Sequence, residues 1–187
     1  MFSYCRDKNV WSFLLIGPKT LRITVDKNIA YQVHDTPERS FIRVSDKASY
    51  LNCSPFRDFI LNRLDAGQRN FIVDFDNCKS LDSTFLGILA SLAIKVKSSG
   101  SLSLLNLRDR NLETVQNLGI HKIAIVSMES FEGPAGIQSI EAKKLEVRAS
   151  NHLIHEAHKT LMDLNQKNQK LFCDVVKFLE QKKEEGA

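Results

Sequence analysis

The chain contains few cysteines, the residues that form the disulfides of small extracellular domains and bind structural metals. Its 187 residues include four cysteines, Cys5, Cys53, Cys78 and Cys173, and none of them forms a C-x-x-C pair. Cysteines so far apart argue against both a disulfide framework and a zinc site. We therefore expect reduced thiols in a cytosolic protein and no bound metal.

Long apolar runs are also missing. No stretch approaches the roughly 18 apolar residues that a membrane-spanning helix requires. The apolar run at residues 11–16 is shorter than the hydrophobic region of a typical secretory signal, and no small-residue cleavage site clearly follows it. We expect no membrane insertion, no signal peptide and a cytoplasmic location.

Charge of one sign is not concentrated anywhere in the chain. Twenty-six Lys and Arg residues oppose 22 Asp and Glu residues, giving a net charge of +4, and the positive charges are spread along the sequence. Nucleic-acid binding usually requires a clustered basic face, so no nucleic-acid partner is predicted. The hydrophobic content of 43% suits one core with an appendage.

Motifs that would indicate catalysis are absent. There is no Gly-rich phosphate loop, no Gly-x-Ser-x-Gly elbow and no Cys-His nucleophile pattern. His152, His155, Glu156 and His158 have spacings that can gather metal ligands on a helix, but they miss the His-Glu-x-x-His register. We interpret them as the polar flank of a helix, and we predict a binding module that is not an enzyme and needs no cofactor.

The most informative segment is residues 81–87, Leu-Asp-Ser-Thr-Phe-Leu-Gly. It follows an apolar strand at residues 71–75 and opens a helix. The apolar residues of that helix recur with helical period, at Phe85, Leu86, Leu89, Leu92, Ala93 and Val96. Ser83 is therefore expected at or beside the first residue of the helix.

Two roles for this serine follow from its position. Unpaired N–H groups and the helix dipole stabilise a phosphate at a helix N-terminus, whereas an ordinary serine there caps a backbone donor. Asp82 would oppose a phosphate, which suits a switch better than a permanent ligand. Asp82 and Asp74 are candidates either for orienting a partner's phosphorylating machinery or for capping the turn. Capping is the simpler role for Asp82, and the Asp74 carboxylate is expected to point to a strand end or a solvated edge.

The order of strand and helix signals predicts an α/β fold. We expect a mixed sheet with an N-terminal hairpin around residues 36–39 and parallel strands, with helices mainly on one face. Ser54 is expected to cap the helix that Pro55 begins. The predicted segments are an extension at 1–27, either loosely held or a hairpin, a domain at 28–128, a linker at 129–148 and a long amphipathic helix at 149–184.

The long C-terminal helix carries an apolar stripe of seven-residue period that a polar residue, Asn168, interrupts. The stripe consists of Ile154, Ala157, Leu161, Leu164, Leu171, Val175 and Phe178. An exposed stripe of this length invites aggregation, so it is expected to pack on the core, on a second copy as a homodimer, or on a partner. A polar residue in such a seam often fixes the register of paired helices.

Residues 29–127, about half of the chain, resemble the STAS family of sulfate transporters and bacterial anti-sigma factor antagonists. The resemblance rests on the Asp-Ser-Thr turn and on the elements around it. They are the hairpin at 29–35 and 41–45, the helix at 56–64, the strands at 71–75 and 102–107, and the helix with its glycine stop at 111–120. Phe85 stands where the family usually has glycine, and its ring is expected to narrow the choice of partner.

The resemblance implies an anti-sigma factor antagonist that a partner serine kinase phosphorylates at Ser83. It implies a partner-binding surface formed by Asp82, Ser83, Thr84, Phe85 and Leu86, with Thr84 as the secondary hydroxyl. The implied partners are an anti-sigma factor kinase, which brings ATP and magnesium, and a phosphatase. The alternatives are a STAS subunit of a lipid-transport ATPase complex and a scaffold assembled through the C-terminal helix.

Overall fold

A computed structural model of the chain describes residues 31–127, 134, 136–139 and 149–185. The two interpretations of residues 1–27 lie outside the described residues, as does most of the predicted linker at 129–148.

The described strands form one mixed sheet in the order β5-β4-β3-β2-β1-β6. They are β1 (Tyr31–Asp35), β2 (Ser40–Ala48), β3 (Asn70–Leu81), β4 (Ser101–Leu105), β5 (Ile125–Ser127) and β6 (Gln138–Ser139). β1 and β2 are antiparallel, and β2, β3, β4 and β5 run parallel. The predicted hairpin and parallel strands are confirmed. β6, which falls within the predicted linker, pairs with the free edge of β1.

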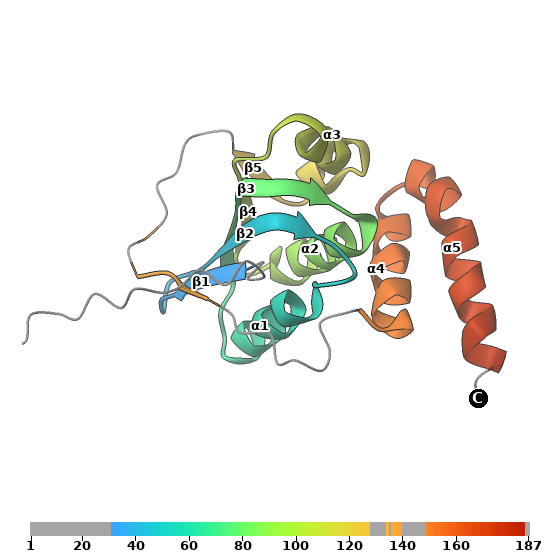
Figure 1. Cartoon of the computed structure of the whole chain (residues 1–187), viewed down its shortest axis with the longest axis horizontal. Helices are drawn as coiled ribbons and strands as arrows, with labels where there is room; N and C mark the ends of the chain where they lie inside the picture. Colours follow the sequence, from blue (N-terminus) through green and yellow to red (C-terminus); the bar gives the residue numbers. More distant parts are fainter. Residues whose placement is uncertain (1–30, 128–133, 135, 140–148, 186–187) are drawn as a thin grey trace, which may run out of the picture.

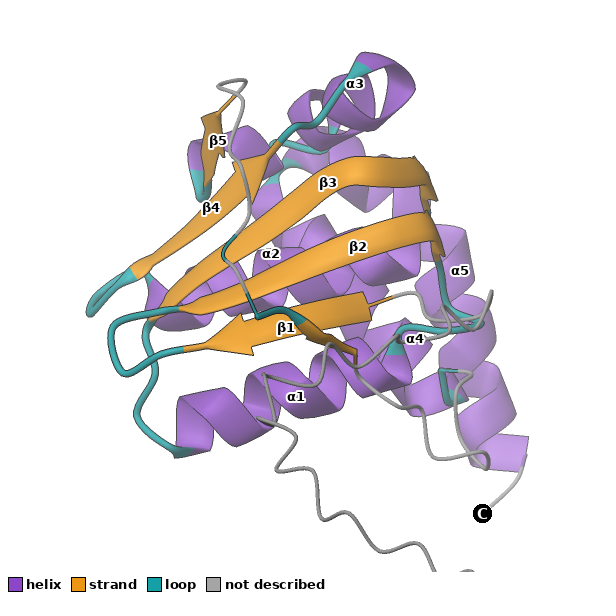
Figure 2. Ribbon diagram, turned by 60° about the vertical axis from the view of Figure 1, so that its left-hand side comes forward, coloured by secondary structure: helices purple, strands orange, loops and turns teal. Residues whose placement is uncertain are grey.

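The helices build outward from one face of the sheet. They are α1 (Ser54–Asp65), α2 (Ser83–Val96), α3 (Asp109–Asn117), α4 (Asn151–Leu164) and α5 (Gln166–Glu185), with a 3₁₀ turn at Ile120–Lys122. α1 and α2 lie against the sheet (Figure 2), α4 packs on α2, and α5 packs on α4 (Figure 1). No helix in the described ranges is both long and apolar enough to span a bilayer.

The start of α1 differs by one residue from the prediction. Cys53, not Ser54, is the N-cap residue, and no side chain caps the helix there. Pro55 still lies in the first turn, where its missing N–H leaves no helix bond unmade.

An aromatic cluster fills the core between the sheet and the helices. Phe85 lies at its centre, with its ring centroid 4.6 Å from Phe56, 6.1 Å from Tyr31 and 6.4 Å from Phe75. Aromatic pairs at such distances stabilise a core beyond the area that they bury. The bulky residue that stands at the family's glycine position is therefore a core residue, and its side chain is fully buried.

The C-terminal segment folds back on its own chain as a helical hairpin, in which α5 buries Phe172 and Val176 rather than the predicted stripe residues Leu171, Val175 and Phe178. Asn165 adopts extended backbone and divides the single helix predicted at 149–184 into α4 and α5. Its side-chain oxygen accepts a hydrogen bond from the backbone N–H of Asn168 at 2.9 Å and so caps α5. The Asn168 side chain, which is fully buried, donates to the carbonyls of Leu118 and Leu161 at 2.9 and 2.8 Å. Asn168 thus fixes the hairpin against the α/β domain within one chain.

Helix α2 is covered on two sides because its sequence is apolar nearly all round. Phe85 and Leu89 belong to the core cluster, while Gly87 faces α4. A Cβ built on Gly87 would lie 2.4 Å from the Ala157 carbonyl oxygen and 2.7 Å from the Ala157 Cα. The missing side chain therefore lets the two helix backbones approach closely.

We predict that Gly87→Ala weakens the docking of α4. Alanine favours an isolated helix by about 1 kcal/mol over glycine, but here its methyl group would meet the Ala157 backbone. Overpacking of this kind costs about 1–3 kcal/mol. Urea unfolding and hydrogen exchange of α4 amides measure the loss, with Ser91→Ala on the same helix as the matched control. A Gly87→Ala protein that is more stable than the wild type would contradict the close approach.

Candidate functional site

Asp82 caps α2 and ties it to the loop before α1. Its backbone is extended, and its Oδ1 accepts from the Phe85 amide at 2.8 Å. Its Oδ2 accepts from the Tyr50 amide at 2.7 Å. The capping role predicted for Asp82 is confirmed. Because the Phe85 amide is already engaged, this donor is not open to a phosphate.

Ser83 is the first residue of α2, and its hydroxyl is not used for capping. Ser83 is partly buried, and its Oγ lies 2.9 Å from Nε2 of His158 on α4. This hydrogen bond joins residues 75 positions apart in the chain. The hydroxyl at the start of α2 therefore contacts the C-terminal hairpin.

His158 is the residue of this site that the sequence interpretation missed. Its assignment to a polar flank is wrong, because it is only 5% exposed. It lies four residues after Ile154 and three before Leu161, which is the spacing of the apolar stripe itself, and that spacing could have placed it in the seam. The ring of Phe172 packs against it at a centroid distance of 5.1 Å.

The five residues predicted to bind a partner fall into two groups. Asp82 and Ser83 are partly exposed, whereas Thr84, Phe85 and Leu86 are buried. Of these five residues, only the two at the N-terminal end of α2 reach the surface.

A surface loop lies beside that end of the helix. Tyr50 donates to Asp82, and the next residue, Leu51, is 53% exposed. The carbonyl of Tyr50 accepts from the Ala149 amide at the start of the hairpin. We call Tyr50, Leu51, Asp82 and Ser83 the Ser83 patch. It combines an exposed aliphatic side chain, a carboxylate and a hydroxyl at the junction of the loop, α2 and α4.

Burial keeps two titratable neighbours of Asp82 neutral. Burial, with a smaller contribution from the Asp82 charge, raises the pKa of the Cys53 thiol to about 12. Burial also raises the pKa of the Tyr31 phenol far above its usual value, with smaller contributions from Cys53, Cys78 and Asp82. Near pH 7 the thiol and the phenol are therefore uncharged, and Asp82 supplies the negative charge beside Ser83.

Asp74 is buried and paired, so its expected place at a strand end or solvated edge is wrong. Its carboxylate is fully inaccessible and accepts from Arg43 Nε and from Asn106 Nδ2, each at 2.8 Å, and from the Asp76 amide at 3.1 Å. Parallel pairing sets Arg43 beside Asp74 across β2 and β3. A buried carboxylate requires such partners, so this cluster is explained by structure alone.

The other candidate ligands on the C-terminal hairpin are engaged in different contacts. His155 lies 3.2 Å from Glu180 and 3.4 Å from Glu156, while His158 faces Ser83. Among the residues that the structure describes, no group of three His, Cys, Asp or Glu side chains is placed to hold a metal ion.

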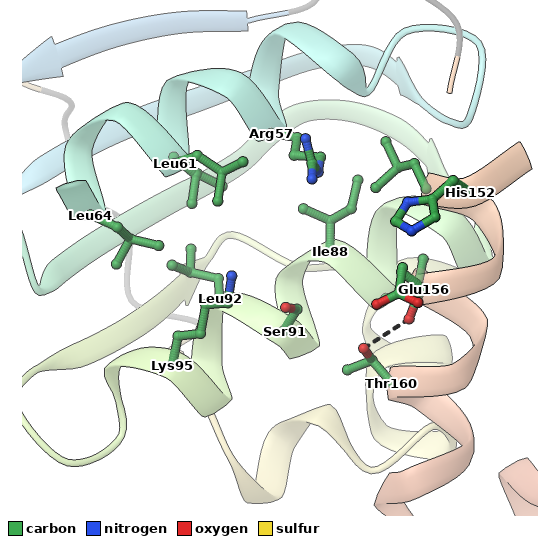
Figure 3. Close-up of a pocket in the computed structure, with 14 residues that line it drawn as sticks. Arg57, Leu61, Leu64, Ile88, Ser91, Leu92, Lys95, His152, Glu156 and Thr160 are labelled. Atoms are coloured by element: carbon green, nitrogen blue, oxygen red, sulfur yellow. Dashed lines mark hydrogen bonds between the residues drawn. The ribbon is translucent and has the colours of Figure 1, made fainter. Parts of the chain in front are cut away.

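A cavity of about 150 Å³ lies between α1, α2 and α4. Figure 3 shows leucines from α1 and α2 on its apolar walls, with Arg57, Lys95 and His152 around them. Ser83 and His158 do not line it. α4 therefore rests on α2 along one side and leaves a space toward α1 on the other.

Comparison with known proteins identifies the domain. A family model described as "Mlab, STAS domain" matches residues 31–127, which is more than half of the chain. No match was found among curated proteins.

Several solved structures are similar to the chain. The anti-sigma factor antagonist SpoIIAA in its unphosphorylated form is 20% identical, over 54% of this chain and 90% of its own, with a TM-score of 0.45. A putative anti-sigma factor antagonist from Thermotoga maritima is 14% identical over 53% and 86%, with a TM-score of 0.49. An anti-sigma factor antagonist from Mycobacterium paratuberculosis is 18% identical over 53% and 85%, with a TM-score of 0.47.

The separate roles of Asp82 and Ser83 predict different costs of removing them. Asp82→Ala removes a helix cap and the Tyr50 contact, which together contribute about 1–3 kcal/mol to the free energy of unfolding. Ser83→Ala removes only the bond to His158 and should cost about 1 kcal/mol. Urea unfolding of both variants measures these values. A larger loss for Ser83→Ala than for Asp82→Ala would show that the serine is the cap.

Proposed function

Because the chain belongs to the STAS domain family, we propose that it is a regulatory binding protein whose affinity for a partner is set by phosphorylation of Ser83. The partner is a serine kinase of the anti-sigma type, and a phosphatase reverses the modification. In the unphosphorylated state the Ser83 patch docks on the partner, which then releases a sigma factor. The protein thus acts as an anti-sigma factor antagonist.

One observation carries this proposal. The Ser83 hydroxyl lies at the exposed end of α2 and has no part in capping the helix, since Asp82 does that. A hydroxyl that only stabilised the helix would accept from a backbone amide of the first turn. The Ser83 oxygen is therefore not needed for the cap, and its side-chain hydrogen bond with His158 is open to change by a covalent modification.

The loss of affinity that phosphorylation should cause follows from the added negative charge. A phosphoserine adds about two negative charges near pH 7, and here they would lie next to the carboxylate of Asp82. Repulsion and desolvation of a few kcal/mol are enough to end docking, because each 1.4 kcal/mol changes affinity about tenfold. The chain itself binds rather than catalyses, and the kinase supplies ATP and magnesium.

We predict that Ser83→Asp lowers the affinity for the partner at least about tenfold, since the added charge costs more than 1.4 kcal/mol in the contact. A pull-down from native lysate identifies the partner, phosphosite mapping reports the state of Ser83, and titration calorimetry compares the variants. Ser99→Asp, at an exposed position in the turn that follows α2, adds the same charge away from the patch and should bind as the wild type does. Equal affinity of Ser83→Asp and wild type would overturn the switch and favour the alternative of a constitutive subunit of a transport ATPase.

A second candidate function, assembly of copies through α5, is favoured by one observation. Within the C-terminal stripe Ala157 and Leu161 are buried, but Leu171, Val175 and Phe178 remain exposed at 58, 39 and 54%. Their spacing of four and three residues places them on one side of the helix. A second copy of α5 would cover this short seam.

Sedimentation velocity over a range of concentrations tests the assembly. A dimer formed through α5 predicts that Leu171→Glu with Phe178→Glu shifts the protein to monomer, because two charges would then lie in the seam. Gln181→Glu, on an exposed position of the same helix, is the matched control and should leave the mass unchanged. A wild-type protein that stays monomeric at every concentration removes this candidate.

A further inference from the structure

The bond between Ser83 and His158 has a defined direction. His158 Nδ1 lies 2.8 Å from the carbonyl oxygen of Ile154, and a carbonyl can only accept, so Nδ1 carries a proton. In the neutral ring Nε2 is then an acceptor, and the Ser83 hydroxyl donates to it at 2.9 Å. The hydroxyl proton of Ser83 is thus part of the joint between α2 and α4.

The joint has little room for an added group. His158 is 5% exposed and lies against the ring of Phe172. One helical turn further along α2, the backbone of Ala157 approaches Gly87 so closely that not even a methyl group would fit. A substituent on Ser83 Oγ that points toward α4 would therefore displace atoms of α4 or be displaced by them.

We propose that phosphorylation of Ser83 weakens the packing of the α4–α5 hairpin on the domain. The modification removes the hydroxyl hydrogen that Ser83 donates to His158, and it thereby loosens the contact between α4 and α2. This rests on the proposed function, in which a kinase transfers the γ-phosphoryl group of ATP. In that step the bond between the γ-phosphorus and the bridging oxygen of ATP breaks. An Oγ–P bond replaces the Oγ–H bond, ADP leaves, and the hydroxyl proton passes to a base of the kinase.

The lost donor and the lack of room favour loosening over a tighter contact. After phosphorylation the Oγ–H donor is gone, and His158 Nε2 keeps a partner only if the ring or the phosphate binds a further proton, while the carboxylate of Asp82 lies next to Ser83 in the chain. The Phe85 amide, a donor that could hold a phosphate at this helix end, is already engaged by Asp82. A buried acceptor left without its donor destabilises the arrangement that buries it.

The rest of the hairpin confines the response to α4. Its start is held by the bond between Ala149 and Tyr50, and its turn is held by Asn165 and Asn168 on the carbonyl of Leu118. Between these attachments α4 is supported by α2 and α5, whereas a cavity separates it from α1 (Figure 3). The middle of α4, where His158 lies, can therefore move while both ends stay attached. Such movement changes the surface of α4 that borders the Ser83 patch.

Hydrogen exchange of the full-length chain with phosphoserine incorporated genetically at position 83 tests the proposal without a kinase. We expect α4 amides to exchange about tenfold faster or more than in the unmodified chain, which corresponds to about 1.4 kcal/mol, with strands β2 to β4 unchanged. Phosphoserine at Ser99 is the matched control and should leave α4 protected. Unchanged or slower exchange of α4 with phosphoserine at position 83 overturns the proposal.

A double-mutant cycle shows whether His158 transmits the effect. His158→Ala should itself speed exchange of α4, and adding phosphoserine at position 83 should then produce a clearly smaller further increase than in the wild type. Equal increases in both backgrounds would mean that the phosphate acts elsewhere. If His158→Ala does not fold, His158→Gln serves in the same cycle. Because the phosphate is placed genetically, failure here leaves kinase recognition of Ser83 to be judged by phosphosite mapping alone.

Discussion

The structure depends on the burial of α2 from two directions. One side of this helix covers the sheet through Phe85 and Leu89, and the other receives α4 at Gly87. A helix that is apolar all round must find such cover, since neither side can face water without loss of stability. The second layer of cover comes from the C-terminal hairpin of the same chain, so the hairpin is part of how this STAS domain is built.

The burial of α2 on two sides also explains where Ser83 lies. The first residue of α2 is where the buried helix emerges, and here a hydroxyl, a carboxylate and an imidazole meet. Asp82 holds the helix end through the amides of Phe85 and Tyr50, which leaves Ser83 to contact α4. The helix cap and the proposed switch thus belong to neighbouring residues with separate contacts. A covalent change at the serine can alter how the hairpin sits while the cap stays intact.

Local signals in the sequence predicted much of the fold. Alternating apolar residues indicated the strands, and an acidic residue before an apolar helical run indicated both the cap at Asp82 and the position of Ser83. The failures concern contacts between distant segments. Asp74 is buried because Arg43 and Asn106 come to it from neighbouring strands, and His158 is buried because α4 folds back on α2. The break at Asn165 was hidden because the apolar spacing continues through it, although its capping of α5 is a familiar role for asparagine.

The central claim is that the Ser83 hydroxyl donates to Nε2 of His158, whose ring carries its proton on Nδ1, within the joint between α2 and α4. Long-range proton–nitrogen correlation spectra of the histidine rings, recorded on the wild type and on Ser83→Ala, test it most directly. The account predicts that His158 carries its proton on Nδ1 in the wild type and that its Nε2 resonance shifts when the serine hydroxyl is removed. A His158 ring that is protonated on Nε2, or that exchanges between tautomers as an exposed imidazole does and ignores the substitution, would contradict the account.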